Sequence, residues 1–258
     1  MTNILCTISG GRTSGFMAVF LKERYPNDNL LFCFANTGKE NEETLIFLDK
    51  IDKQFDLSVV WLEAVTHEGK GNGTTYKEVN FKTASRNGEP FEPMFEKYGL
   101  PSKLYRHCTR EGKEKPIHKY AKEFFGSTNY ETALGIRADE KHRANPKPKV
   151  IYPLVEMNID ERFIKDWWKK QSFDLKLEDF EGNCDFCFLK SQKKRMKLLK
   201  GGLDVSWWQE MEELHKRPRQ PMFDVRNDYT ISQLIEMNNN DTQLSIFDDS
   251  SFDCFCKN

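Results

Sequence analysis

The sequence lacks any long hydrophobic run. None of its 258 residues belongs to a stretch that approaches the roughly 20 apolar residues of a membrane-spanning helix. No basic segment followed by a long apolar run opens the chain, because residues 4–8 are too few for the apolar part of a signal peptide. These absences predict a soluble, cytoplasmic protein.

An excess of charge of either sign is also missing. Lysine and arginine total 39 against 40 acidic residues, so the formal net charge is -1 at pH 7. This balance gives no overall electrostatic signature of nucleic-acid or membrane binding, and any basic contact surface has to be local. The five histidines are scattered, with none at metal-ligand spacing from another.

The first half alternates short apolar runs with helical patterns. Residues 4–8, 30–35 and 57–62 read as strands, and residues 16–24 and 42–55 read as the helices between them. This βαβαβ order predicts an α/β fold with a doubly wound, mainly parallel sheet. The later predicted elements are a helix over 113–125, a strand over 130–135, a helix over 159–170 beginning at Asp160, and helices near 191–199 and 205–216.

Three regions are expected. Residues 1–170 form the α/β domain, 171–237 form a helical, cysteine-containing region packed on it, and 238–258 form a flexible acidic tail. Within the first region, residues 66–90 are rich in glycine, lysine and asparagine. We expect an exposed loop there, a candidate lid over a ligand.

Residues 9–14, Ser-Gly-Gly-Arg-Thr-Ser, separate the first predicted strand from a helix expected to begin near Ser14. A glycine turn here lets backbone N–H groups and the helix dipole converge on one point, which predicts an anion site. The hydroxyls of Ser9, Thr13 and Ser14 add possible donors to phosphate oxygens. A plain turn with a serine or threonine helix cap is the alternative interpretation. A Walker loop is excluded, since G-x-x-x-x-G-K-[ST] does not occur.

This segment resembles the PP-loop of the adenine nucleotide alpha hydrolase-like superfamily. Four later segments, in the right order, resemble the phosphoadenylyl-sulfate (PAPS) reductase-like branch of that superfamily. Together the matches span roughly residues 4 to 170. The four segments are Asn36-Thr37-Gly38-Lys39-Glu40; Arg106-His107-Cys108-Thr109 with Lys113 and Pro116; Gly135-Ile136-Arg137-Ala138-Asp139-Glu140 with Arg143; and Tyr152-Pro153-Leu154.

The resemblance implies a Rossmann-like sheet of the HUP or PP-loop type that binds ATP or PAPS. It assigns the pyrophosphate or phosphosulfate group to Ser9, Gly10, Gly11, Arg12, Thr13 and Ser14, and the base and ribose to Asn36, Thr37, Gly38 and Glu40. It assigns further phosphate contacts to Gly135, Arg137 and Arg143. Arg137 is also the candidate catalytic residue that stabilises developing negative charge. ATP-cleaving members carry Asp where Thr13 stands, which argues against hydrolysis with the usual metal arrangement, although Mg²⁺ remains an allowed cofactor.

The cysteines divide into two groups. Cys6 and Cys33 fall in predicted buried strands and are expected in the core. The candidate metal ligands are Cys108, Cys184, Cys187, Cys254 and Cys256. Structural disulfides are not expected, because the cytosol keeps thiols reduced and a core this large needs no crosslinks.

Cys184-Asp185-Phe186-Cys187 has the C-x-x-C spacing at which two thiolates grip one metal. Cys108 is the candidate third ligand, and Cys254 or Cys256 the fourth. Spacing leaves zinc and a [4Fe-4S] cluster both open. The resemblance favours the cluster, since several sulfur-moving members of the superfamily hold one beside the nucleotide. Free cysteines and a redox-active dithiol are the remaining alternatives.

A dense basic segment follows the C-x-x-C pair. It contains Lys190, Lys193, Lys194, Arg195, Lys197 and Lys200. Such a segment either binds a polyanion such as nucleic acid or forms a solvated helix face. Trp167-Trp168 and Trp207-Trp208 could stack on bases, but pairs of this kind more often place one ring in the core, which is the expectation here.

The tail contains two further candidates. Gln243-Leu244-Ser245-Ile246-Phe247 resembles the pentapeptide by which bacterial replication and repair proteins dock into the sliding clamp. The alternative is that Leu244, Ile246 and Phe247 pin the tail to the body. Cys254 and Cys256 are candidate nucleophiles, although the chain lacks the Glu-Cys-Gly-x-His ending of the PAPS reductases proper.

These patterns predict a PAPS reductase-like enzyme that acts at the α-phosphoryl or sulfuryl group of an adenine nucleotide. Sulfur transfer or adenylation is the expected chemistry, with a thiolate-bound iron–sulfur or zinc site and with nucleic acid among the acceptors. The sequence is similar to versions met on phages and other mobile elements. One alternative is a PAPS or adenylyl-sulfate reductase that releases sulfite. The other is a non-catalytic nucleotide- and metal-binding adaptor recruited to the sliding clamp.

Overall fold

The computed structural model describes residues 1–69, 71–102, 104–215 and 229–240. Across these ranges, six strands form one sheet in the order β4-β3-β2-β1-β5-β6. The strands are β1 (Asn3–Ile8), β2 (Asn29–Asn36), β3 (Val60–Thr66), β4 (Thr74–Val79), β5 (Glu131–Ala133) and β6 (Val150–Ile151). Neighbouring strands pair in parallel except β3 and β4, which pair antiparallel. The predicted α/β fold with a mainly parallel sheet is confirmed.

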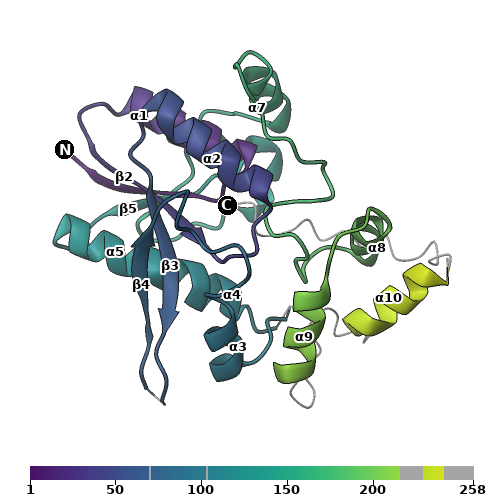
Figure 1. The fold of residues 1–258 in the computed structure, drawn as a ribbon. Coiled ribbons are helices and arrows are strands. Elements are labelled where there is room, and N and C mark those ends of the chain that lie inside the picture. The colour runs from purple at the N-terminus through teal and green to yellow at the C-terminus, as the bar shows by residue number, and fades with distance from the viewer. Residues whose placement is uncertain (70, 103, 216–228, 241–258) are drawn as a thin grey trace.

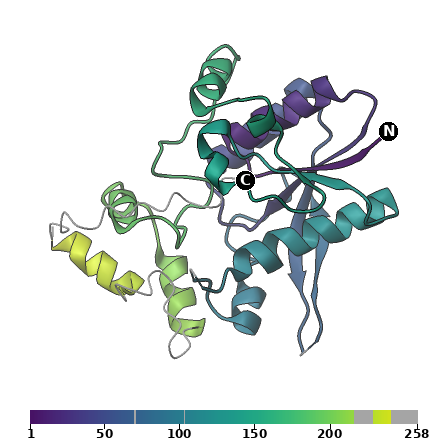
Figure 2. The ribbon, with the colours of Figure 1, turned by 180° about the vertical axis from the view of Figure 1, so that it is seen from behind.

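Helices cover both faces of this sheet. The helical elements are α1 (Arg12–Arg24), α2 (Glu42–Phe55), α3 (Glu92–Tyr98), α4 (His107–Thr109), the π-helical turn η1 (Arg110–Glu114), α5 (Lys115–Phe125), the 3-10 segment η2 (Ala138–Arg143), α6 (Pro153–Glu156), α7 (Glu161–Trp168), α8 (Gln192–Lys200), α9 (Ser206–His215) and α10 (Ile231–Asn239). Helices α1 and α2 lie on one face and α5 on the other (Figure 1, Figure 2). Among the described residues, no helix combines the length and apolar character needed to cross a membrane.

Side chains of β1 alternate between the two faces. Cys6 and Ile8 pack with the buried residues of α1 and α2, whereas Leu5 packs with those of α5. Cys6 and Cys33 are fully buried, as predicted. Burial raises the pKa of the Cys6 thiol far above its ordinary value and raises that of Cys33 to about 12. Both behave as small apolar core residues.

A second body of buried residues lies outside the sheet. It joins α3 to α8, α9 and α10, and it includes Cys108, Cys184 and Cys187. Trp208 is buried there and Trp168 is buried beside α1, whereas their neighbours Trp207 and Trp167 are half-buried. The expectation that each tryptophan pair places one ring in the core is confirmed.

The expectation of an exposed loop over residues 66–90 is wrong for residues 74–79. Residues 74–79 form β4, which pairs with residues 61–66 of β3 at the edge of the sheet. The segment Thr-Thr-Tyr-Lys-Glu-Val carries the β-branched and aromatic residues of a strand. An edge strand needs only one apolar face, so it showed no continuous hydrophobic run.

Most helix starts agree with the sequence signals. Asp160 caps α7 by accepting a hydrogen bond from the Phe163 N–H at 2.8 Å, and Ser191 caps α8 through the Lys194 N–H at 3.3 Å. The third strand, expected over 57–62, begins at Val60 instead, because Ser58 has a left-handed φ of 56° that interrupts an extended chain. Leu57 and Val59 are buried in the connection that precedes the strand. The helix expected from 113 begins as α5 at Lys115, after η1.

Acid pH is expected to remove a stabilising ion-pair cluster at Glu111. Its buried carboxylate accepts hydrogen bonds from Thr74 Oγ1 at 2.9 Å, Arg110 Nε at 2.9 Å and Lys115 Nζ at 2.8 Å. Burial raises the pKa of Glu111, but these donors outweigh it and hold the pKa below its ordinary 4.5. The stabilisation is therefore complete above about pH 4.5 and is lost as the pH falls through the folded-state pKa.

Glu111→Gln is expected to lower the free energy of unfolding at pH 7 by about 2 kcal/mol, because it removes a buried acceptor of charged hydrogen bonds. The variant should also lose less stability than the parent between pH 4.5 and 3. Urea unfolding at several pH values measures both effects. The control is Glu114→Gln, which makes the same charge change at an exposed position. Equal losses in the two variants would contradict the assignment.

Candidate functional site

The carboxyl ends of β1 and β5 form the point where the sheet changes winding direction. β2 and β3 lie to one side of β1, and β5 and β6 lie to the other. Ligands of open α/β sheets bind at such a point. A cavity of about 90 Å³ opens there. Its lining includes Ser9, Gly11, Arg12, Thr13, Ser14, Gly135 and Arg137. The structure thus brings the two predicted phosphate-contacting segments to one cavity.

The loop between β1 and α1 is held in a tight turn by hydrogen bonds to Ser14. Ser14 Oγ accepts a hydrogen bond from the Ser9 N–H at 3.1 Å and donates to the Gly11 carbonyl at 3.1 Å. Gly10 has φ +79°, and a Cβ added to it would lie 2.3 Å from Thr44 Cγ2. Gly11 is the N-cap of α1 and provides no side-chain cap. The first N–H groups of α1 therefore lack the serine or threonine cap of the alternative interpretation.

The first turn of α1 is fixed from the opposite wall of the cavity. Arg12 Nε donates to Asp174 Oδ1 at 2.7 Å, and its terminal nitrogen donates to the Leu175 carbonyl at 2.5 Å. The indole N–H of Trp168 donates to the Arg12 carbonyl at 2.9 Å. Because Trp168 is fully buried, these bonds tie the helix start to the core. Arg12 and Leu175, which the Arg12 side chain joins, both line the cavity.

Arg137 lies in the cavity wall among carboxylates. Its guanidinium donates two hydrogen bonds to Asp139, at 3.0 and 2.8 Å, and lies 3.4 Å from Glu140 and 3.9 Å from Glu161. Burial lowers the pKa of Arg137, but the bond to Asp139 and the nearby carboxylates raise it overall. The same bond holds the pKa of Asp139 below its ordinary value. Arg137 is thus cationic and already paired. Arg143 donates to Glu140 at 2.6 Å and does not line the cavity.

Charges around the cavity balance. Its charged lining residues are Arg12, Arg137, Lys165, Glu161, Glu178 and Asp179. An anion bound here would gain little from net side-chain charge, so the aligned N–H groups of α1 are its main electrostatic partner. The carboxylates of Glu178 and Asp179 are of the type that Mg²⁺ prefers.

The other predicted nucleotide-binding segment does not line this cavity. Asn36 is buried, and its Nδ2 donates to Glu63 Oε1 at 2.6 Å and to the Ser85 carbonyl at 2.9 Å. The N–H and Oγ1 of Thr37 both donate to Glu40, at 2.8 and 2.7 Å. Gly38 is buried as well. The side chains of this segment thus organise the loop after β2.

The same loop pairs with the segment that contains the C-x-x-C motif. The Asn41 N–H donates to the Asn183 carbonyl and the Asp185 N–H donates to the Lys39 carbonyl, both at 2.9 Å. Asn183 also lines the cavity beside residues 9–14, which we call the phosphate-loop cavity after the phosphate contacts predicted for those residues. Residues 182–185 therefore connect this cavity with the cysteines. Nothing in the local sequence marks Asn183 for this position, because the contact joins segments more than 140 residues apart.

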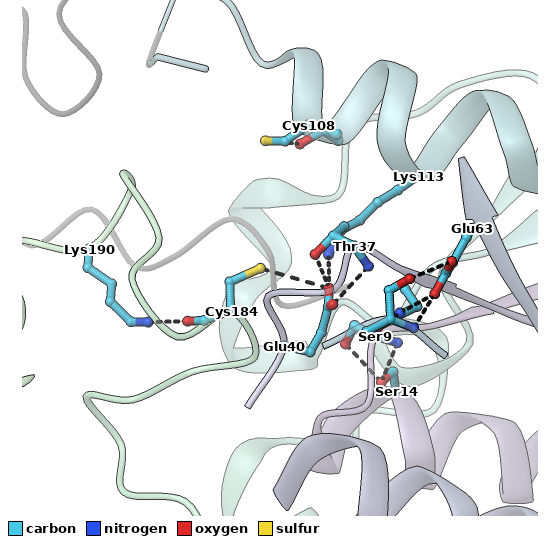
Figure 3. A network of polar contacts seen from close by, with 12 residues as sticks. Ser9, Ser14, Thr37, Glu40, Glu63, Cys108, Lys113, Cys184 and Lys190 are labelled. Atoms are coloured by element: carbon cyan, nitrogen blue, oxygen red, sulfur yellow. Dashed lines mark hydrogen bonds and ion pairs between the residues drawn. The ribbon is translucent and has the colours of Figure 1, made fainter. Parts of the chain in front are cut away.

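Three of the predicted metal ligands, Cys108, Cys184 and Cys187, line a second cavity, which we call the thiol cavity. Cys184 Sγ lies 4.0 Å from Glu40 Oε1, and Lys113 Nζ lies 3.4 Å from the same oxygen, so Glu40 stands between them (Figure 3). Within the described ranges, no three His, Cys, Asp or Glu side chains already converge as a metal centre. Cys254, Cys256 and the clamp-like peptide 243–247 lie outside the described residues.

The predicted basic segment is not a uniform surface. Lys190 is buried, and its ammonium donates to the carbonyls of Cys184 and Asp185. Arg195 is buried too. Lys193, Lys197 and Lys200 are exposed on α8. Part of the segment thus stabilises the C-x-x-C turn.

No protein-family model matches the sequence. The chain is 35% identical over 198 residues to the nin region protein ORF290 of Escherichia phage lambda, a match that covers 75% of this chain and 68% of the phage protein. It is 25% identical over 165 residues to protein MJ0973 of Methanocaldococcus jannaschii, covering 62% of this chain but 32% of the archaeal protein. Both relatives are named as uncharacterized. The identity to the phage protein extends over two thirds of its length, and the chain therefore belongs to the family of the phage lambda nin region protein ORF290.

Proposed function

We propose that this protein is an adenine-nucleotide-binding enzyme of the PAPS reductase-like branch of the PP-loop superfamily, with a sheet of the HUP type. It acts at the α-phosphoryl or sulfuryl group, in sulfur transfer or adenylation chemistry. One observation carries the proposal. The loop 9–14 and the segment 135–137 resemble the phosphate-contacting motifs of that branch, and they line one cavity at the switch point of a parallel sheet.

Each wall of this cavity suits a different part of the nucleotide. The uncapped N–H groups at the start of α1, with the Ser9 and Thr13 hydroxyls, would bind the phosphate or phosphosulfate oxygens. Ile164, Leu175 and Leu177 provide an apolar surface for the adenine ring. Glu178 and Asp179 line the same cavity, and their carboxylates would hold Mg²⁺ on the phosphates. ATP and PAPS share these features.

Arg137 would serve the reaction itself. Its guanidinium is planar, remains charged and lines the same cavity as the phosphate loop. A bidentate guanidinium suits the equatorial oxygens of a phosphoryl or sulfuryl group under attack, and it would stabilise the charge that develops there. Binding of the nucleotide would have to move Arg137 away from Asp139, since the two now form two hydrogen bonds.

The thiol cavity suits a soft metal. Cys108, Cys184 and Cys187 would hold it, with Cys254 or Cys256 as the fourth ligand. Thiolate sulfur suits both zinc and a [4Fe-4S] cluster. When bound, a cluster would supply one-electron chemistry or a site for sulfur, and zinc would supply structural support. Glu40 lies against Cys184, and Lys113, which also lines the thiol cavity, pairs with Glu40.

Calorimetric titration with ATP, AMP and PAPS tests the nucleotide proposal. We expect at least one of them to bind with a stoichiometry near one. Anaerobic purification followed by iron, sulfide and zinc analysis tests the thiol site, and an absorbance band near ~400 nm with bound iron would indicate the cluster. A folded sample that binds none of the three nucleotides would overturn the proposal.

Asp139→Asn is expected to tighten nucleotide binding about tenfold, because Arg137 would no longer be neutralised by its bidentate partner. The Glu161 N–H now donates a hydrogen bond to Asp139 Oδ1 at 3.0 Å, and the Oδ1 atom of asparagine can accept the same bond. The control is Glu161→Gln, since Glu161 lies farther from Arg137, at 3.9 Å, and is half exposed. Titration of both variants with ATP and PAPS measures the effect. An unchanged or weaker affinity in Asp139→Asn would contradict this role of Arg137.

A further inference from the structure

A surface patch of three stacked rings lies beside α4. His107 stacks on Tyr98 at a ring-centroid distance of 5.5 Å and an interplanar angle of 23°, and on Tyr105 at 6.0 Å and 10°. We call Tyr98, Tyr105 and His107 the stacked patch. Tyr105 is 48% exposed, and its neighbour Leu104 is 70% exposed. The outer ring thus presents much of its surface to solvent.

Basic side chains border this patch. Lys97 Nζ lies 5.3 Å from the centroid of the Tyr98 ring and donates to the His67 carbonyl at 2.6 Å. Lys97, Tyr98, Arg110 and Lys115 line one surface hollow, together with a single acidic residue, Glu111. The carboxylate of Glu111 is buried, whereas the side chains of Arg110 and Lys115 are about half exposed. The exposed charge of the hollow is therefore positive.

We propose that the stacked patch binds single-stranded nucleic acid. Unpaired bases stack on exposed aromatic rings, and neighbouring cations contact the phosphates that link them. A duplex keeps its bases stacked inside, so it offers the rings nothing equivalent. The hollow lined by Lys97, Arg110 and Lys115 would accept the backbone, and Tyr105 would be the stacking ring most accessible to a base.

The position of the patch connects it with the chemistry. His107 and Cys108 are consecutive residues of α4, one in the stacked patch and the other in the wall of the thiol cavity. Figure 1 shows α4 beside α3, on the side of the sheet that faces α9. A strand on the patch would therefore run past the element that presents Cys108. This makes single-stranded nucleic acid the acceptor of the sulfur-transfer or adenylation reaction. The role as acceptor rests on the proposed function, whereas the binding of single strands to the stacked patch does not.

Fluorescence anisotropy of the full chain with labelled 12-nucleotide strands of oligo(dT) and oligo(U), and with a hairpin duplex of similar length, tests the proposal. We expect both single strands, or one of them, to bind at least about tenfold more tightly than the duplex. The comparison of oligo(dT) with oligo(U) identifies DNA or RNA as the preferred strand. Raising the salt should weaken binding, because phosphate contacts release counterions.

Tyr105→Ala is expected to weaken single-strand binding about tenfold, and Tyr105→Phe to leave it nearly unchanged, because stacking needs the ring and not the hydroxyl. The matched control is Phe124→Ala, which removes a ring that is 49% exposed on α5. Arg110→Ala should reduce the slope of log affinity against log salt by about 0.7. Equal effects of Tyr105→Ala and Phe124→Ala, preference for the duplex, or no single-strand binding would each overturn the proposal.

Calorimetry with ATP or PAPS separates this proposal from the previous one. Tyr105→Ala should bind the nucleotide like the parent protein, since Tyr105 does not line the phosphate-loop cavity. If the protein binds single strands but neither ATP nor PAPS, the proposal for the stacked patch stands and the proposed function is wrong. If the protein binds ATP or PAPS but no single strands, the nucleotide site stands and the stacked patch is not the acceptor surface.

Discussion

Gly10→Ala is expected to lower the affinity for ATP or PAPS at least about tenfold and to lower the free energy of unfolding by about 3 kcal/mol. Two effects add. The left-handed φ of +79° is unfavourable for an alanine, and the new Cβ would lie 2.3 Å from Thr44 Cγ2. Thr44 is fully buried on α2, so it cannot swing aside. The loop has to move instead, and the hydrogen bonds around Ser14 that aim the α1 N–H groups are lost.

Two variants separate the clash from the backbone strain. Thr44→Ser removes the methyl group that the new Cβ would meet, so the Gly10→Ala/Thr44→Ser protein should recover part of the affinity. Gly126→Ala places alanine at a φ of +63° where no atom lies within 4 Å of the new Cβ. It should lose roughly 1 kcal/mol of stability without any change in nucleotide affinity. Calorimetric titration and urea unfolding measure the two quantities. Unchanged affinity in Gly10→Ala would show that the loop over residues 9–14 does not bind the nucleotide.

The strand, turn and helix around residues 9–14 could be predicted because their signals are local. An apolar run, two glycines and a helical pattern follow one another within 20 residues, and together they predict a strand, a turn and a helix, which begins at Arg12 rather than near Ser14. In the folded chain β1 pairs in parallel with β5, which places the ends of these two strands side by side. The segment 135–137 therefore reaches the same cavity as residues 9–14. Asp160 and Ser191 were predictable as helix boundaries for the same local reason.

The other features of the fold and of the candidate site depend on long-range contacts, which no local sequence pattern predicts. Asn183 joins the phosphate-loop cavity only because residues 182–185 pair with the loop after β2. Asp139 was part of a recognised segment, but only the folded chain shows that it neutralises Arg137. β4 was missed because an edge strand with one polar face lacks the hydrophobic run that marks a buried strand. Long-range pairing, rather than residue propensity, decides all three.

Cys184→Ser is expected to reduce the bound metal of anaerobically purified protein at least about tenfold, if the thiol cavity holds a cluster or zinc as proposed. The serine hydroxyl is a poor ligand for soft metals, and Cys184 Sγ lies 4.0 Å from Glu40 Oε1 in the loop after β2. Its loss should remove any iron-dependent absorbance near ~400 nm together with the metal. Elemental analysis and the visible spectrum measure both.

The matched control is Cys33→Ala, which removes a thiol that is equally buried but lies within β2. Burial there raises the thiol pKa to about 12, so Cys33 stays protonated and cannot serve as a thiolate ligand. Its loss should therefore leave metal content unchanged. Cys187→Ser and Cys108→Ser should behave like Cys184→Ser, because all three thiols line the same cavity. Full metal content in all three serine variants would contradict the thiol site, whereas loss in Cys184→Ser and Cys187→Ser alone would restrict it to the C-x-x-C pair.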